Sequence, residues 1–285
     1  MNEPSNIERY LRCIHCQGNL RVIAVDQGQG LIECRQCSEK FPIIQHVPRL
    51  LRGALLENCR CYYREVVAAH PILRDFFHHQ ATLVSQKRSW LDRLTIRTQN
   101  QFGYEWRKWS KLPAYAEHHF FHVTKKSPEF FSGKVGWDPA VGMGRDITIA
   151  ATAVGKSGLM IGSDVSFAVD VATDRCRHQT NVLIVQADLY SDFLADDVLD
   201  FAYMIGVIQH LPKPKAGIEQ VYRKVRPGGH FFGTVYTSAT DPFSALLVGF
   251  IYFMRIFTVH LPFSAVYAMS WLCALPAYAF FKLPP

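Results

Sequence analysis

The most informative stretch of the sequence is VGWDPAVGMGRDITIA, residues Val135 to Ala150. A short apolar run ends at Asp138, and Gly142 and Gly144 then form a tight turn ahead of a helix-forming run. This order predicts a β-strand, a glycine turn and an α-helix. In such a unit, the backbone N–H groups of the turn and the positive end of the helix face the polar or anionic groups of a ligand. The stretch is therefore typical of a nucleotide-binding domain.

The sequence downstream of this turn alternates between strands and helices. We expect strands at residues 157–164, 181–186, 198–206 and 230–236, and helices at residues 147–154, 166–178 and 215–225. Strands that alternate with helices of this length pair in parallel and are joined by right-handed crossovers. The sequence therefore predicts an α/β fold with a Rossmann-like, doubly wound parallel sheet.

Polar residues recur where the predicted strands end. Asp138, Asp164, Asp188 and His210 follow four different strands, and ligands of such sheets bind at the carboxyl ends of the strands. Asp164 lies twenty positions after Gly144, a spacing that places a carboxylate on ribose hydroxyls. We expect these side chains to line one crevice.

Two common nucleotide motifs do not fit the sequence. A dinucleotide fingerprint requires a third glycine three residues after the second, and the two candidate positions hold Arg145 and Ile147. A Walker-type phosphate loop requires an earlier glycine and a following helix. The segment Gly155-Lys156-Ser157 has Ala150 at the earlier position and leads into a strand.

Four cysteines near the N-terminus have the spacing of a metal site. Cys13-x-x-Cys16 is followed, after seventeen residues, by Cys34-x-x-Cys37. Two residues between thiolates let a tight turn aim both sulfurs at one ion, so the spacing predicts a four-cysteine zinc ribbon. Four thiolates fill a tetrahedral site, which makes the zinc structural rather than catalytic. The alternative is a set of four buried free cysteines. The first ten residues lack a secretory signal pattern, which favours a cytosolic, metal-binding interpretation over disulfides.

The charge and the C-terminal composition point to further partners. The net charge of +7 permits RNA or an anionic membrane as a partner, although no dense Lys/Arg run localises either. From residue 242 onward the chain is strongly apolar, and Arg255, His260 and Pro276 interrupt the apolar runs. This favours an interfacial or substrate-covering helical pair over a transmembrane span.

The region between the cysteines and the glycine turn has a helical pattern. It contains an aromatic cluster, QFGYEW, at residues 101–106. One interpretation is a helix that packs on the sheet. The other is a lid whose rings cover a bound nucleoside, because aromatic faces supply large buried area and stacking. Both stay open at this point.

These motifs together resemble the class I S-adenosylmethionine-dependent methyltransferases, in particular the methyltransferase type 11 group. The resemblance covers residues 135–232 and rests on VGWDPAVGMGRDI, IGSDVS and the run from VQADLY to RPGGHFF. The segment FGYEW resembles the lead-in of a bacterial subgroup. The segments LRCIHCQGNL and ECRQCSEKFPIIQHVPRLL, within residues 11–51, resemble a small zinc-ribbon family that accompanies or activates methyltransferases.

The resemblance implies S-adenosyl-L-methionine as the cofactor, with a structural zinc in the ribbon. At the methionine end of the cofactor, Asp138 would accept a hydrogen bond from the amino group. The backbone at Ala140, Gly142 and Gly144 would approach the amino-acid moiety and the ribose. Ala140 departs from the family, which usually has glycine there.

The resemblance also implies contacts at the other end of the cofactor. Asp164 would hold the ribose hydroxyls, and Asp188 would hold the adenine amino group with Ala187 beside the ring. Ile205 and Gly206 would line the floor near the methyl donor. A final hairpin of sixth and seventh strands is usual in this family, and the sequence after the fifth strand contains no segment that resembles either.

His210 is the candidate general base. It follows the fourth predicted strand, where an acceptor would arrive, and an imidazole exchanges protons near neutral pH.

The sequence predicts that the chain has four parts. They are a zinc ribbon (8–52), a helical connecting or lid region (53–132), the cofactor-binding methyltransferase core (133–240) and an apolar helical tail (241–285).

The predicted function is methyl transfer to a small or lipid-linked acceptor. RNA methylation is an alternative that salt-sensitive RNA binding would favour. A non-catalytic cofactor-binding or activator protein is another alternative, suggested by the ribbon and the missing strands. We expect a cytoplasmic protein, with peripheral membrane contact through the tail as an option, and the sequence does not indicate an oligomeric state.

Overall fold

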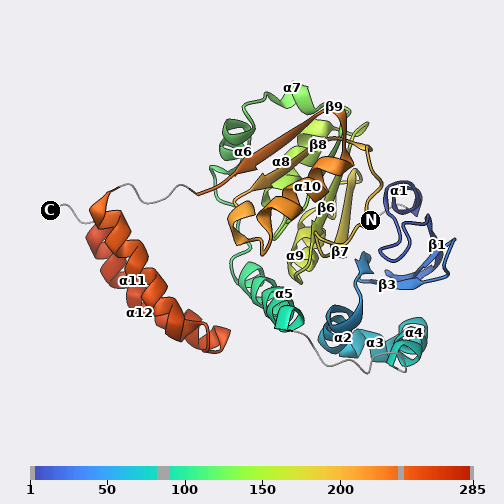
Figure 1. The fold of residues 1–285 in the computed structure, drawn as a ribbon, viewed down its shortest axis with the longest axis horizontal. Coiled ribbons are helices and arrows are strands. Elements are labelled where there is room, and N and C mark those ends of the chain that lie inside the picture. Colours follow the sequence, from blue (N-terminus) through green and yellow to red (C-terminus); the bar gives the residue numbers. More distant parts are fainter. Residues whose placement is uncertain (1–3, 82–89, 237–240, 283–285) are drawn as a thin grey trace. The chain divides into compact units, whose positions relative to one another are not determined.

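A computed structural model describes residues 4–81, 90–236 and 241–282. The chain divides into two compact units, Met1–Val235 and Tyr236–Pro285. Within the described part of the first unit, nine strands form one continuous sheet in the order β1-β2-β3-β4-β7-β6-β5-β8-β9 (Figure 1). The strands are β1 (Leu20–Asp26), β2 (Gln29–Cys34), β3 (Lys40–Ile44), β4 (Val47–Leu50), β5 (Val135–Asp138), β6 (Leu159–Asp164), β7 (Val182–Ala187), β8 (Leu199–Ile205) and β9 (Val225–Thr234).

The helices of the first unit lie before, between and beside these strands. They are α1 (Pro4–Tyr10), α2 (Gly53–Tyr62), α3 (Arg64–Ala69), α4 (Pro71–Ala81), α5 (Trp90–Lys108), α6 (Ala116–Thr124), α7 (Pro128–Phe131), α8 (Arg145–Val154), α9 (Ala168–Arg175), the short 3-10 helix η1 (Ile208–His210) and α10 (Pro214–Lys224).

The five strands from β5 to β9 confirm the predicted Rossmann-like parallel sheet. Each pairs in parallel with its neighbours. The order reverses at β5, with β6 and β7 on one side of it and β8 and β9 on the other. Ligands of such sheets bind at this reversal, outside the carboxyl ends of the strands.

Helices cover both faces of the parallel sheet, so it is doubly wound (Figure 1). Because side chains alternate between the faces of a strand, Met160 and Ile161 belong to different cores. Met160 packs with Phe120 of α6 and Ile147 of α8. Ile161 belongs to the core that contains Val221 of α10.

The N-terminal sheet, β1–β4, is joined to the parallel sheet. β4 pairs in parallel with β7, with Arg49 opposite Gln186 and Leu50 opposite Ala187. Leu20 and Phe41 of the N-terminal sheet share one hydrophobic core with Trp137 of β5. The sequence did not indicate this junction. The ribbon boundary at residues 8–52 stays a prediction.

The last strand differs from its predicted range. β9 begins at Val225 instead of residue 230, and it takes the Pro-Gly-Gly segment into the strand. Gly228 has φ +79°, and the pairing of β8 with β9 shifts between Leu199 and Phe201. A left-handed glycine allows such an irregularity at little cost. Within the described residues, no further strand follows β9.

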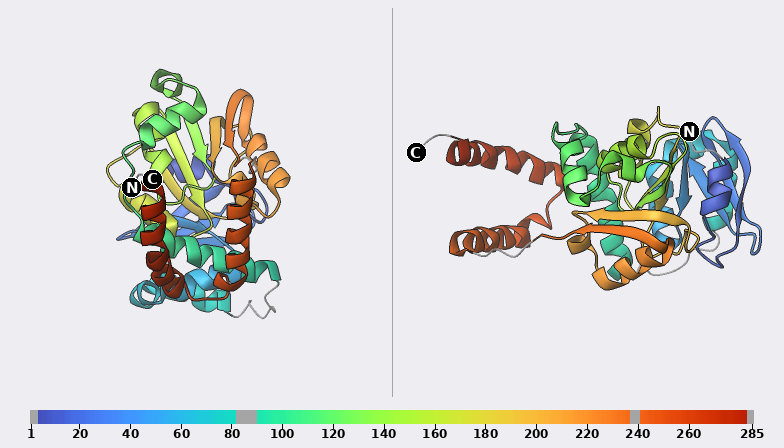
Figure 2. Two further views of the ribbon diagram at one scale, coloured as in Figure 1. Left: turned by 90° about the vertical axis from the view of Figure 1, so that its left-hand side faces the viewer. Right: turned by 90° about the horizontal axis from the view of Figure 1, so that it is seen from above.

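The second unit contains two helices, α11 (Pro242–Thr258) and α12 (Phe263–Lys282). α12 continues through position 276, where a proline interrupts the apolar run of the sequence. A proline removes one hydrogen bond and bends a helix without necessarily ending it. The two helices lie apart from each other beyond their connecting turn (Figure 2). Of the helices in residues 4–81, 90–236 and 241–282, none combines the length and the apolar content needed to cross a membrane.

Candidate functional site

The ends of four parallel strands meet at the carboxyl edge of the sheet. β5 ends at Asp138, β6 at Asp164, β7 at Ala187 and β8 at Ile205. Gly206 follows directly with φ +71°. The residues that the sequence singled out at these strand ends therefore lie along one edge, next to the reversal of strand order at β5.

The glycine turn between β5 and α8 requires its glycines. Gly142 and Gly144 have φ +49° and +83°, in the left-handed region that strains any residue with a Cβ atom. A Cβ atom on Gly144 would also lie 3.0 Å from the Cα atom of Ala172. This close approach packs the start of α8 against α9. Ala140 lies in the same turn, and its N–H donates to Asp138 Oδ1 over 3.4 Å.

Buried carboxylates surround this turn. Asp138 and Asp146 are both less than a tenth exposed. Burial raises the pKa of Asp138 well above its usual value, and the charges of Asp146 and Asp164 raise it further. Arg145 forms an ion pair with Asp146 over 2.8 Å. Burial and like charges both disfavour ionisation of Asp138, and a positively charged group placed beside it would favour its ionised form.

The carboxylate of Asp164 is held by the backbone. Its Oδ2 atom accepts from the N–H of Gly142 over 2.9 Å, and its Oδ1 atom accepts from the N–H of Ser166 over 2.8 Å. Burial raises the pKa of Asp164, and the hydrogen bonds from Ser166 and Gly142 act in the opposite direction. Asp164 thus connects the end of β6 to the glycine turn.

Asp188 and His210 follow β7 and β8. Asp188 is partly buried and its Oδ1 atom accepts from the N–H of Tyr190 over 3.0 Å. Burial raises the pKa of Asp188. His210 is the last residue of η1, and its side chain is exposed. Both residues therefore lie in the loops beyond the carboxyl ends of their strands.

Helix α5 brings the aromatic segment to the glycine turn. The Nε1 atom of Trp106 lies 3.3 Å from the point that a Cβ atom on Gly142 would occupy. Gly103, one turn earlier, allows α5 to approach Phe167 at the start of α9, because a Cβ there would come within 2.8 Å of Phe167 Cβ. The segment forms a helix, but α5 packs against α9 and α2, and Trp106 lies beside the glycine turn. The lid interpretation stays a prediction.

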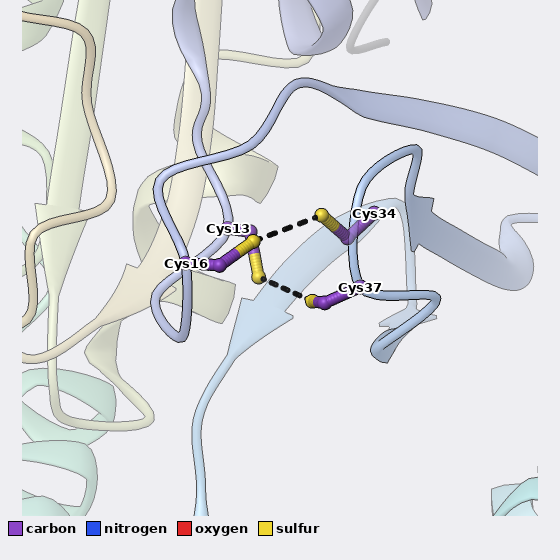
Figure 3. A group of neighbouring side chains, drawn as sticks. All are labelled: Cys13, Cys16, Cys34 and Cys37. Carbon is purple, nitrogen blue, oxygen red and sulfur yellow. Dashed lines mark hydrogen bonds between the residues drawn. The ribbon is translucent and has the colours of Figure 1, made fainter.

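The four predicted metal-binding cysteines come together at the N-terminal sheet (Figure 3). Their sulfur atoms all lie within 4.8 Å of one another. Cys13 and Cys37 are 3.6 Å apart, and Cys16 and Cys34 are 3.5 Å apart, measured between Sγ atoms. A tetrahedral site with Zn–S distances of about 2.3 Å has edges of about 3.8 Å. The cluster is therefore compatible with zinc.

The nearby backbone also suits a thiolate site. The N–H groups of His15 and Gln36 each point at a cysteine sulfur over 3.4 Å, those of Cys13 and Cys34 respectively. Such hydrogen bonds stabilise negative charge on sulfur. Cys59 and Cys61 lie on α2 outside the cluster, the first buried and the second exposed.

Residues 137–233 match the family described as "Methyltransferase domain". The match begins within β5, includes the glycine turn and the ends of β6, β7 and β8, and finishes within β9. A search of curated proteins found no match.

Several solved structures are similar to the chain. A SAM-dependent methyltransferase from Aquifex aeolicus is 20% identical, with 52% of this chain and 85% of that one covered, at a TM-score of 0.42. The arsenic(III) S-adenosylmethionine methyltransferase CrArsM from Chlamydomonas reinhardtii is 23% identical, with 42% and 48% covered, at 0.34. The YcgJ protein from Bacillus subtilis is 22% identical, with 48% and 59% covered, at 0.40. The chain spans less than two thirds of the last two structures.

Sequence reasoning missed two residues near Asp138. Asp146 lies on the first turn of α8, and Tyr203 is fully buried on β8. Burial raises the pKa of Tyr203 well above its usual value, and the charges of Asp138 and Asp146 raise it further. The available signal was a phenol within the run Phe201 to Ile205, where it is the only polar side chain and ordinarily requires a polar neighbour.

Proposed function

We propose that the protein is an S-adenosylmethionine-dependent methyltransferase that acts on a small or lipid-linked acceptor. The observation that carries this proposal is the set of buried carboxylates around the glycine turn, inside a segment that matches a methyltransferase domain. S-adenosylmethionine carries a sulfonium and an ammonium group, and the ionised carboxylate of Asp138 would pair with such a cation. The carboxylates around the turn are acceptors that fit the ammonium group of this cofactor.

The residues near the turn would bind the methionine end of the cofactor. Asp138 would accept from its ammonium group, and the backbone at Ala140, Gly142 and Gly144 would let the amino-acid moiety approach closely. Asp164 would accept from the ribose hydroxyls at the end of β6.

The loops after β7 and β8 would complete the site. Asp188 would accept from the adenine amino group, with Ala187 beside the ring, and Ile205 and Gly206 would form the floor below the methyl group. When bound, the cofactor supplies an electrophilic methyl carbon. The chain's own residues position the acceptor for in-line attack and exclude water.

His210 is proposed as the general base. It would take the proton that a hydroxyl or amine acceptor loses when its oxygen or nitrogen bonds to the methyl carbon. The exposed position of His210 beyond β8 supports this role, because an acceptor entering from solvent would meet it first.

The four cysteines and the helices α11 and α12 have separate roles in this proposal. We assign a structural zinc to Cys13, Cys16, Cys34 and Cys37. A lipid-linked acceptor is supported by the apolar residues of α11 and α12, many of which are exposed. This composition favours a lipid-linked acceptor over RNA, for which no basic cluster is evident in the sequence.

Calorimetry and a transfer assay test the proposal together. We expect the full chain to bind S-adenosylmethionine and to transfer its labelled methyl group to a lipid or metabolite fraction. We expect the His210→Ala variant to bind the cofactor normally and to lose about 100-fold or more in turnover. Absence of cofactor binding would overturn the proposal, and full turnover in His210→Ala would remove the base.

One observation favours a second candidate, a non-catalytic cofactor-binding or activator protein. Within the described residues the sheet ends at β9, without the two further strands that the resemblance led us to expect. The same assay separates the candidates, since this one predicts cofactor binding without transfer to lipid, RNA or metabolite fractions.

A further inference from the structure

The helices α11 and α12 present apolar side chains that nothing within their own unit covers. Leu246, Phe250 and Phe257 of α11 and Trp271 and Leu272 of α12 are each more than half exposed. The two helices lie apart beyond their turn, so neither shields the other (Figure 2). Exposed apolar area on this scale marks an interaction surface.

The apolar residues of α11 point in every direction around its axis. At 100° per residue, the exposed side chains of the helix fall in all sectors of the circle. They are Leu246, Leu247, Val248, Phe250, Ile251, Tyr252, Phe253, Ile256 and Phe257. A protein groove covers one face of a helix, whereas these side chains need a medium that surrounds most of it. A lipid layer is such a medium.

The polar residues of α11 lie along one line. Ser244, Arg255 and Thr258 fall within about 60° of one another, although Ser244 and Thr258 are about 21 Å apart along the axis. If the helix lies flat in a lipid layer, this sector, which also contains the half-exposed Ile251, faces the headgroups. If the helix stands upright, Ser244 and Thr258 differ in depth by most of the layer.

The tyrosines and the tryptophan of α12 also lie along one side of their helix. Tyr267, Trp271 and Tyr278 fall within about 40° of one another and extend over about 16 Å of the axis. The rings of Tyr267 and Trp271 contact edge to face at 6.4 Å. Tyr and Trp prefer the boundary between headgroups and acyl chains. A flat helix places all three rings at that boundary, and an upright helix does not.

The charge of this segment also fits a lipid surface. From residue 242 to the C-terminus the sequence contains Arg255, His260 and Lys282 and no acidic residue. Basic residues close to an apolar helix attract anionic headgroups. We propose that α11 and α12 form an in-plane anchor that binds the surface of an anionic lipid bilayer. This site lies outside the methyltransferase domain and goes beyond the proposed function.

Vesicle flotation tests the anchor with the full chain and without cofactor. We expect the protein to float with phosphatidylcholine vesicles that contain phosphatidylserine, and to float less with phosphatidylcholine alone. The double variant Phe250→Glu, Trp271→Glu should lose flotation. The matched control is Tyr222→Glu, which places the same charge on an exposed tyrosine of α10 and should float as the wild type does. Arg255→Glu should weaken binding to the anionic vesicles about tenfold or more.

A second measurement tests the flat orientation. Subtracting the fluorescence of the Trp271→Phe variant from that of the wild type isolates the emission of Trp271. Lipids brominated at shallow or deep positions of the acyl chain quench this emission according to the depth of the ring. We expect stronger quenching by the shallow label. Deeper quenching would overturn the in-plane arrangement. Failure to float, with a dimeric mass by light scattering, would overturn the lipid assignment in favour of a second copy of the chain. Neither result depends on cofactor binding, so the proposed methyltransferase activity is tested separately.

Discussion

The carboxylate of Asp138 determines how the candidate site responds to pH. Burial raises its pKa in the folded chain above the value of an unfolded aspartate, so the folded state binds more protons. The stability gained from that proton is complete below the unfolded pKa of about 3.9 and is lost as the pH rises through the folded pKa. A cationic ligand has the opposite preference, because it favours the ionised carboxylate.

We therefore predict that S-adenosylmethionine binding releases protons. Calorimetry in buffers of different ionisation enthalpy should detect the release, and affinity should fall as the pH drops through the raised pKa of Asp138. Asp138→Asn should abolish the contribution of this residue to proton release. It should also weaken binding about 10- to 100-fold, since a hydrogen bond to a charged group contributes about 1.5–3 kcal/mol.

The same substitution should stabilise the chain without ligand at neutral pH, because an amide does not resist burial as a carboxylate does. Thermal unfolding measures this effect, and the gain over the wild type should grow with pH. Asp174→Asn on the surface of α9 serves as the matched control for affinity and stability. Wild-type affinity and proton release in Asp138→Asn would contradict the assignment.

Some features of this site are readable from the sequence and others are not. Asp138 and Asp164 could be placed at strand ends because a buried strand is a continuous apolar run that stops at a polar residue. The burial of Asp138 beside Asp146 could not be predicted, because it depends on how α8 packs over the turn. The position of Trp106 against Gly142 is likewise a contact between distant segments, which no local pattern records.

At the scale of elements, one buried arginine fixes β4, the strand that joins the N-terminal sheet to the parallel sheet. Arg49 is fully buried, and its guanidinium donates to Gln186 Oε1 over 2.9 Å, to the carbonyl of Ile44 over 3.0 Å and to Asp170 Oδ1 over 2.8 Å. The hydroxyl of Tyr63 also donates to Asp170. The bonds of Arg49 connect β4 to β3, β7 and α9, and the bond of Tyr63 adds the junction between α2 and α3 to the same network.

We predict that Arg49→Ala lowers the free energy of unfolding by about 3–5 kcal/mol, because it leaves the polar partners of a buried charge without their donor. Denaturant unfolding measures the change. Arg35→Ala is the matched control, since Arg35 pairs with Glu8 where both side chains are exposed, and an exposed pair contributes at most about 1 kcal/mol. Equal effects of the two substitutions would show that the buried network does not hold β4 in place.

The sequence does not show that the residues of this network lie close together in space. The segment Val47-Pro48-Arg49-Leu50 was noted for its resemblance to a ribbon motif, and four residues with a proline do not indicate a strand. Its pairing with β7 joins positions more than 130 residues apart. Non-local strand pairing of this kind depends on the whole fold, whereas the strand–turn–helix unit at Val135 to Ala150 is specified locally.

At the scale of the whole first unit, the N-terminal sheet and the parallel sheet share one interior. A single hydrophobic core contains Leu20, Ile32 and Phe41 of the N-terminal sheet together with Trp137 and Leu183 of the parallel sheet. The four cysteines are more than 95 positions before β5 in the sequence. Cys13 and Cys34 nevertheless belong to the same hydrophobic core as Trp137 of β5. A metal at these cysteines would therefore stabilise more than the hairpin that carries them.

We predict that the purified protein contains zinc, measured by metal analysis, and that removing it destabilises the first unit as a whole. Binding at a four-cysteine site stabilises small zinc domains by about 10–16 kcal/mol, which equals or exceeds the stability of a typical domain. Chelation or Cys34→Ser should therefore expose the amides of β5, around Trp137, to hydrogen exchange in the same transition as those of β2. Cys61→Ser, on an exposed cysteine outside the cluster, should change neither metal content nor exchange. If the N-terminal sheet lost protection while β5 kept it, the two sheets would be independent and the shared core would not couple them. The single sheet order through β4 and β7 leads us to expect one transition.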